Sequence, residues 1–275
     1  AVLLVTTLPY LYAYWSAPAG WQFMGILVNV PDHAQYFAWF KQYLSQDLAS
    51  NTLTSEPNAP VFFNLLWWAL AKLGAGLGWD YAAMFQVLRV AATGLSLVVL
   101  YRLCAWFLPT RPARRIAFLV AVFSSGLGWL LIVLKYLLGV EEYPLFLNLL
   151  IYIVEPNTFF ALLATPHLAE AVLYMVVFEL VLQGETKHQW RYAVGAGLFA
   201  QVMGWQHAYD LFLIYGVLGG YGLLKLIRDR RLPPYLLGAG GIVAGLSGWA
   251  GPSSRLLTSL DPVWSAVLEQ FDNAG

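Results

Sequence analysis

Residues 82–115 read AAMFQVLRVAATGLSLVVLYRLCAWFLPTRPARR, and this stretch decides the fold. Its apolar part, residues 82–107, is longer than the roughly 20 residues that a helix needs to cross a membrane. Arg111, Arg114 and Arg115 follow it directly. Because short cytoplasmic loops of membrane proteins are enriched in Lys and Arg, this end of the segment is predicted to face the cytoplasm.

The composition of the whole chain agrees with a membrane protein. Of its 275 residues, 60% are hydrophobic, 16% are aromatic and only 11% are charged, with 15 Lys and Arg balancing 15 Asp and Glu. Soluble domains usually carry about a quarter of their residues as charged side chains. This excludes an ordinary cytoplasmic enzyme, a disordered chain and a basic nucleic-acid binder. Cys104 is the only cysteine, so an intrachain disulfide is excluded.

Apolar runs predict an all-α polytopic integral membrane protein with about seven transmembrane helices. The predicted spans are residues 1–15, 82–107, 116–138, 166–182, 192–205, 211–227 and 235–250. An eighth apolar run, residues 60–77, is predicted not to cross. If it crossed, the basic cluster after residue 107 would lie on the opposite side from the later clusters, against the rule that basic loops stay inside.

The first outer loop, residues 16–81, is predicted to carry two interfacial helices. Residues 32–49 place aromatic and aliphatic side chains at helical spacing against polar ones, the pattern of a helix that lies in the membrane surface. Residues 60–77 form the second. With this topology most acids and three histidines, His33, His167 and His207, fall on the outer side, so function is expected on that face. The chain begins inside an apolar run at Ala1 and is predicted to be a processed or partial version of a longer protein.

The most distinctive outer motif is Pro31-Asp32-His33-Ala34-Gln35-Tyr36, just beyond the first predicted span. An acid in the pattern Asp-x-x-x-Tyr after a first span, followed by two surface helices and a span ending in basic residues, resembles the C-type (GT-C) membrane glycosyltransferases. The similarity is greatest to the branch that uses polyprenyl-phosphate sugars, which includes protein mannosyltransferases and lipid A aminoarabinose transferases. It implies one GT-C-like module over residues 1–275, with a further C-terminal part absent, and Asp32 as the acid essential for transfer.

Two departures from that family pattern leave the use of a divalent metal and the choice of donor open. Many members have two adjacent acids where this chain has Asp32-His33. Many also open the second surface helix with Pro-Pro, where this chain has Asn58-Ala59-Pro60.

Transfer with inversion needs a base for the acceptor hydroxyl and donors that hold the departing phosphate. Asp32 is the candidate base, and it also fits a capping box with Gln35 at the third helical position. The two interpretations are compatible. The further substrate-binding candidates are His33, Tyr36, Glu56, Arg89, Glu155, His167, His207 and Asp210.

Each further candidate has a plainer alternative. His207 and Asp210 can simply cap a turn, and His167 can be an interfacial histidine bonded to a backbone carbonyl. Glu56 can be a solvated loop residue. Arg89, within a span, needs a partner such as an acid or a lipid phosphate, or else reaches to the interface.

The predicted function is transfer of a sugar from a polyprenyl-phosphate carrier to a lipid, glycan or protein acceptor. The predicted site lies on the extracytoplasmic face of the plasma membrane, as in a bacterial inner membrane, with membrane lipids and other membrane proteins as partners. The alternatives are a non-catalytic subunit of a larger membrane complex and a transporter. No haem is expected, because His167 and His207 both lie at predicted helix ends.

Overall fold

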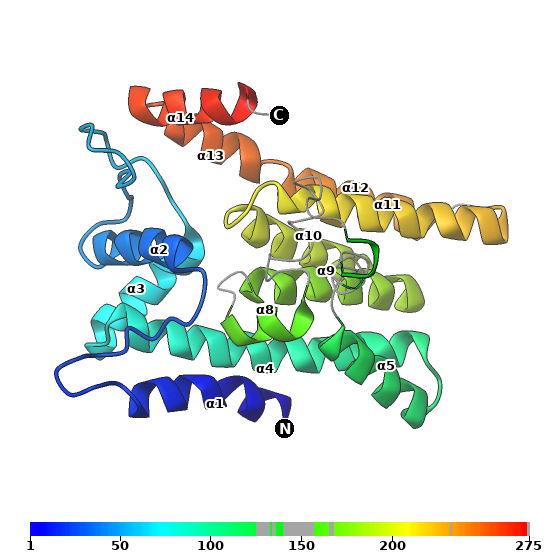
Figure 1. Cartoon of the computed structure of the whole chain (residues 1–275). Helices are drawn as coiled ribbons and strands as arrows, with labels where there is room; N and C mark the ends of the chain where they lie inside the picture. Colours follow the sequence, from blue (N-terminus) through cyan, green and yellow to red (C-terminus); the bar gives the residue numbers. More distant parts are fainter. Residues whose placement is uncertain (125–132, 134–135, 140–156, 165–167, 232, 274–275) are drawn as a thin grey trace. The chain divides into compact units, whose positions relative to one another are not determined.

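The structure is a computed structural model, and it describes residues 1–124, 133, 136–139, 157–164, 168–231 and 233–273 (Figure 1). Within these residues the chain forms α-helices and no β-strand. Only Ala49 and Phe62 pair there through their backbones, as an isolated antiparallel bridge. The all-α prediction is therefore confirmed for the described part of the chain.

The described helices follow one another in the order shown by the colours of Figure 1. They are α1 (Val2–Trp15), α2 (Val30–Tyr43), α3 (Leu65–Leu77), α4 (Tyr81–Phe107), α5 (Arg111–Phe123), α8 (Thr158–Ala164), α9 (Leu168–Lys187), α10 (Trp190–Gly204), α11 (Asp210–Asp229), α12 (Pro234–Ser247), α13 (Ala250–Thr258) and α14 (Pro262–Asn273). The chain divides into two compact units. The first unit comprises residues 1–30 and 85–169, and the second comprises residues 31–84 and 170–275.

In the first unit, side chains of α1 and α4 satisfy backbone carbonyls at the end of α8. The Tyr10 hydroxyl donates to the Leu163 carbonyl at 3.0 Å, and the Thr93 hydroxyl donates to the Leu162 carbonyl at 2.9 Å. The last carbonyls of a helix have no partner within it, and a buried one is costly to leave unpaired. These two bonds therefore hold α8 against α1 and α4.

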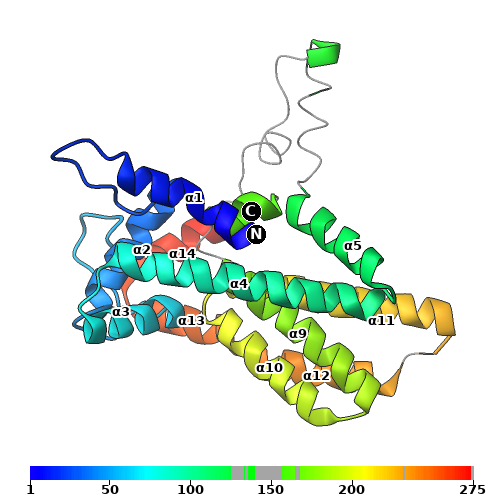
Figure 2. The same cartoon turned by 90° about the horizontal axis from the view of Figure 1, so that it is seen from below.

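The core of the second unit is built by α9 to α12, and small residues bring α10 and α12 close together (Figure 2). Ala196 and Ala200 of α10 and Ala239 of α12 are fully buried in one cluster. A Cβ atom on Gly197 would lie 2.7 Å from Leu246 Cδ1 and 3.1 Å from Leu246 Cβ, so a larger residue there would force the Leu246 side chain to move. Contact through small residues is typical of helices packed inside membranes.

Length and apolar composition identify two membrane-crossing candidates among the described helices, α4 with 27 residues and α11 with 20. α11 leaves large apolar side chains uncovered: Phe212 is 77% exposed and Leu224 is 67% exposed. α3 has 13 residues and extends only about 20 Å, against a hydrocarbon core of roughly 30 Å. Since α1, α5 and α12 have only 14, 13 and 14 residues, this length does not set α3 apart, and the prediction that residues 60–77 do not cross stays a prediction.

The two helices predicted at residues 32–49 and 60–77 are shorter than expected, and the reason lies in local hydrogen bonds. The Gln42 side-chain oxygen accepts from the Ser50 backbone at 2.8 Å, which turns the chain back after α2. The bridge between Ala49 and Phe62 then holds the chain extended until Asn64 caps α3 by accepting from the Trp67 backbone. Residues 44–49 and 60–64 are therefore not helical, which corrects both boundaries.

Asp261 joins this extended segment to the start of α14. One carboxylate oxygen accepts from the Ala59 backbone at 2.8 Å, and the other accepts from the backbones of Val263 and Trp264. The bond from the Ala59 N–H is the main reason that the pKa of Asp261 lies below its ordinary value of 3.8. The nearby rings of Phe62 and Trp264 stack at 5.3 Å.

Because its pKa is lowered by folding, Asp261 contributes stability above pH 3.8, the ordinary value, and loses that contribution as the pH falls through the folded pKa. We expect Asp261→Asn to melt at a lower temperature than the wild type at pH 6. Acidification to about pH 3 should narrow this difference, because Asp261 in the unfolded wild-type chain is then protonated and folding must release that proton. Thermal unfolding in detergent at the two pH values measures it. If the difference in melting temperature were the same at both pH values, the charge of Asp261 would not be its cause.

Candidate functional site

Asp32 lies in the first turn of α2 and is exposed to solvent. The helix begins at Val30, after Asn29 has taken a left-handed conformation with φ 56°. Asp32 is therefore inside the helix, and the predicted capping box with Gln35 is wrong. A carboxylate in the first turn is still stabilised by the helix dipole. The position leaves the Asp32 carboxylate open to solvent on a rigid element.

His33 and Tyr36, both predicted to bind substrate, are instead buried beneath Asp32. The His33 side chain is 1% exposed, and its Nδ1 shares a hydrogen bond of 2.7 Å with the Tyr81 hydroxyl. The Tyr36 ring stacks on Trp67, with ring centroids 4.7 Å apart and planes at 16°. These contacts fix the first two turns of α2 against α3 and the start of α4. The two residues therefore support the site and do not line its open side.

Removing the Tyr81 hydroxyl should show how strongly this support matters. We expect Tyr81→Phe to lower the free energy of unfolding by about 1–3 kcal/mol, because a ring nitrogen of buried His33 loses its hydrogen bond. Denaturant unfolding of the detergent-solubilised protein measures the effect. Tyr12→Phe is the matched control, since Tyr12 is 67% exposed and should lose almost nothing. Equal stability of the two variants would show that the bond between His33 and Tyr81 does not help to hold α2 in place.

Charged and phenolic groups of several elements act electrostatically on the Tyr36 phenol. Burial is the main cause that raises the pKa of the Tyr36 phenol, and the negative charges of Asp32 and then Glu170 raise it further. Tyr209, in the turn between α10 and α11, also raises the pKa of Tyr36 through its charge. The structure thus brings the first turn of α2, the first turn of α9 and this turn within electrostatic reach of one another.

His207 lies in the turn before α11, and its side chain pairs with that of Asp210, the first residue of α11. His207 Nδ1 lies 3.4 Å from an Asp210 carboxylate oxygen, and each side chain is 21% exposed. The Tyr174 hydroxyl of α9 donates to the Asp210 carbonyl at 3.1 Å. Gln206 fixes the turn to α3, because its side-chain oxygen accepts from the Leu66 backbone at 3.0 Å. The predicted turn-capping role of His207 and Asp210 is compatible with their position beside Tyr209.

The remaining predicted residues are placed elsewhere or not described. Glu56 is exposed in the loop between α2 and α3. Arg89 belongs to the first unit and is buried, donating to the Thr6 carbonyl at 3.2 Å and lying 4.1 Å from the Tyr10 ring centroid. A carbonyl and an aromatic ring therefore hold its charge, and the predicted reach to the interface is wrong. Glu155 and His167 lie outside the described residues.

Two residues of this site were not selected from the sequence. Glu170 is only 5% exposed and stands inside an apolar run, where ionisable groups normally face a protein interior or a water-filled cavity. That signal could have identified it. Tyr209 has no comparable sequence signal, because its role depends on where the turn folds. Among the described residues, no group of three or more His, Cys, Asp or Glu side chains could hold a metal ion.

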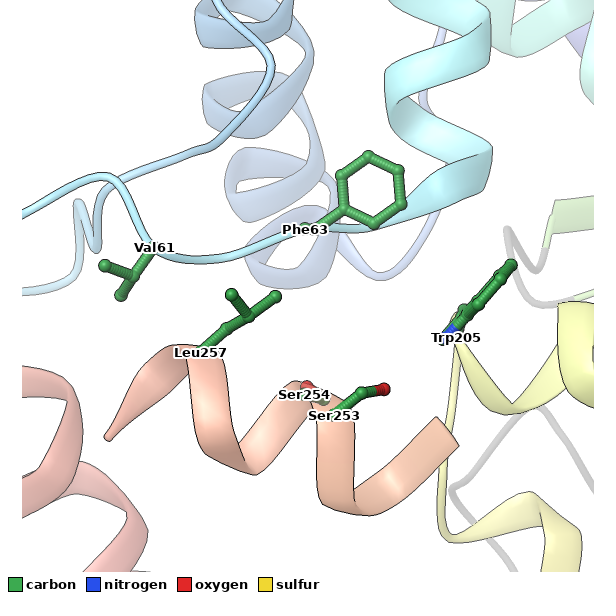
Figure 3. Close-up of a pocket in the computed structure, with 6 residues that line it drawn as sticks. All are labelled: Val61, Phe63, Trp205, Ser253, Ser254 and Leu257. Carbon is green, nitrogen blue, oxygen red and sulfur yellow. The ribbon is translucent and has the colours of Figure 1, made fainter. Parts of the chain in front are cut away.

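A pocket of about 240 Å³ lies in the second unit, and Figure 3 shows its lining. The wall is apolar except for two serine hydroxyls. The lining residues are Val61 and Phe63 before α3, Trp205 after α10, and Ser253, Ser254 and Leu257 on α13. Pockets lined mainly by apolar and aromatic groups with a few polar ones are typical of small-ligand sites. Trp205 connects this pocket along the chain to the turn that holds His207.

Comparisons with known proteins assign the chain to no family. No model of a protein family matches the chain, no curated protein matches it, and no solved structure matches it.

Proposed function

We propose that the chain is a membrane glycosyltransferase module that moves a sugar from a polyprenyl-phosphate carrier to a lipid, glycan or protein acceptor. The observation that carries the proposal is the contrast within the first turns of α2. Asp32 is exposed, whereas the neighbouring His33 and Tyr36 are buried and held by Tyr81 and Trp67. An exposed carboxylate on a rigid frame can reach the hydroxyl proton of a bound acceptor, which is what a general base requires.

The proposal places α1, α4, α5, α9, α10, α11 and α12 in the membrane, with α2 and α3 at the extracytoplasmic surface of the plasma membrane. Exposed apolar side chains support this placement, because Phe212, Leu224 and Ile227 of α11 are each more than 60% exposed. Lipid would cover such a surface at no hydrophobic cost. The small-residue contacts between α10 and α12 also favour it.

The proposed reaction is a single displacement, with inversion, at the anomeric carbon of the donor sugar. The acceptor hydroxyl oxygen attacks the anomeric carbon, and the bond from that carbon to the phosphate oxygen breaks. The polyprenyl phosphate leaves with the electron pair, while the hydroxyl proton passes to the Asp32 carboxylate and then to water. His207, partly exposed beside Asp210, would donate to a phosphate oxygen. Trp205 would offer a ring face to the sugar.

The direct test uses the wild-type chain in phosphatidylcholine and phosphatidylglycerol vesicles. Radiolabelled polyprenyl-phosphate mannose and polyprenyl-phosphate aminoarabinose are supplied as donors, with a bacterial membrane extract as the source of acceptors. We expect one donor to release polyprenyl phosphate and to label an acceptor, and boiled protein to do neither. Retention of label on both donors, with protein shown to be folded, would contradict the proposal.

A further inference from the structure

A second cavity, separate from the residues around Asp32, runs between α11 and α12. It is a groove of about 380 Å³ with apolar walls. Gly219 of α11 and Gly240 of α12 both line it, and no atom lies within 4 Å of where a Cβ would stand at either residue. The groove is therefore open space that the packing of the two helices leaves unfilled.

The length of the groove suits a hydrocarbon chain that reaches across one leaflet. At one end the hydroxyls of Tyr215 and Ser247 share a hydrogen bond of 2.8 Å. The lining continues along α11 to Leu226, and a helix advances about 16 Å over that interval. This is about half of a hydrocarbon core of roughly 30 Å, the depth of one leaflet.

The other end of the groove, where α11 ends and α12 begins, is basic. Arg228, Arg230 and Arg231 are exposed there. Arg228 is paired with Asp229 at 2.6 Å, and the nearby Lys225 is bonded to Glu185. Arg230 and Arg231 follow directly after the helix. Clusters of this kind at a membrane surface attract anionic lipid headgroups.

We propose that this groove binds an anionic phospholipid, with an acyl chain between α11 and α12 and the headgroup phosphate beside Arg230 and Arg231. The proposal rests on the membrane insertion proposed above but not on sugar transfer. Charge complementarity selects this occupant over a second copy of the chain. Two copies inserted in the same direction and paired through this face would bring their arginine clusters together, and like charges repel.

The headgroup part is tested by titrating delipidated, detergent-solubilised protein with dioleoylphosphatidylglycerol or dioleoylphosphatidylcholine and following its melting temperature. We expect tighter binding of the anionic lipid. The double variant Arg230→Gln, Arg231→Gln should lose about thirtyfold of that preference, since each basic residue near a surface is worth about fivefold in affinity. Equal binding of the two lipids by the wild type, or an unchanged preference in the double variant, would overturn the proposal.

The chain-binding part is tested with a matched pair of glycine substitutions on α11. Gly219→Leu fills the groove, whereas Gly216→Leu adds the same side chain outside it, and both positions have open space for a Cβ. We expect only Gly219→Leu to abolish stabilisation by phosphatidylglycerol while melting normally without lipid. Equal responses of the two variants would refute the site. Conversion of a dimer to a monomer by Gly219→Leu alone would instead assign the groove to a second copy.

These results are distinguishable from failure of the proposed enzyme. A chain that transfers no sugar yet keeps its lipid preference refutes the transfer reaction alone. A chain that does not insert into vesicles refutes both proposals.

Discussion

Asp32→Asn is expected to reduce the initial rate of sugar transfer by about a hundred- to ten-thousand-fold, the usual contribution of a general base. The amide has nearly the shape of the carboxylate but cannot accept the acceptor hydroxyl proton. Because Asp32 is exposed, the substitution should leave the melting temperature almost unchanged. The measurement is release of polyprenyl phosphate from labelled donor in vesicles that contain equal amounts of wild-type or variant protein.

Asp80→Asn is the matched control for this loss of charge. Asp80 is also an exposed acid at the start of a helix, and its carboxylate accepts from the Ala83 backbone at 2.9 Å. An asparagine oxygen can accept the same bond, so α4 keeps its cap. We expect Asp80→Asn to transfer at the wild-type rate. If Asp32→Asn did the same, Asp32 would not be the base, and a non-catalytic subunit would become the better interpretation.

Gly204→Ala should have the largest effect on stability, lowering the free energy of unfolding by about 3 kcal/mol. A Cβ at this position would lie 2.5 Å from Ala250 Cβ and 2.8 Å from Leu211 Cδ1. Gly204 is the last residue of α10, and Ala250 is the first residue of α13. The two helices would have to separate, and buried contacts would be lost. Chemical denaturation of the detergent-solubilised protein measures the change.

Two further variants separate overpacking from a general effect of adding a methyl group. Gly195 lies in the same helix, but its added Cβ would be 3.6 Å from Leu180 Cδ1, an ordinary contact. Gly195→Ala should therefore be neutral or stabilising by about 0.5–1 kcal/mol. The double variant Gly204→Ala, Ala250→Gly removes the closest clash and should recover most of the loss. Failure of the double variant to recover would show that the close approach is not the cause.

Much of the helical framework was predictable from the sequence because long apolar runs are local signals. Residues 82–107 were predicted as a span and form α4 (Tyr81–Phe107), and residues 211–227 lie within α11 (Asp210–Asp229). The ends of α2 were not predictable in the same way. They depend on the bond from Ser50 to Gln42 and on the bridge between Ala49 and Phe62, which join residues that no periodic pattern relates.

The candidate site shows the same division. The sequence singled out Asp32 by its type and position, and the structure leaves it exposed on α2. Burial of His33 and Tyr36 could not be deduced, because amphipathic spacing shows that a face is apolar but not which protein surface covers it. Glu155 and His167 stay predictions, and so does the resemblance to GT-C glycosyltransferases.

The sequence by itself determined that the described part of the chain is all-α and rich in apolar helices, since composition and apolar run length act within one segment. Only the tertiary structure decided that Glu170 and Tyr209 act electrostatically on Tyr36, and that Gly219 and Gly240 line a groove. These relations join residues far apart in the chain. Their free energy comes from burial and short-range contact, which exist only after the helices have packed.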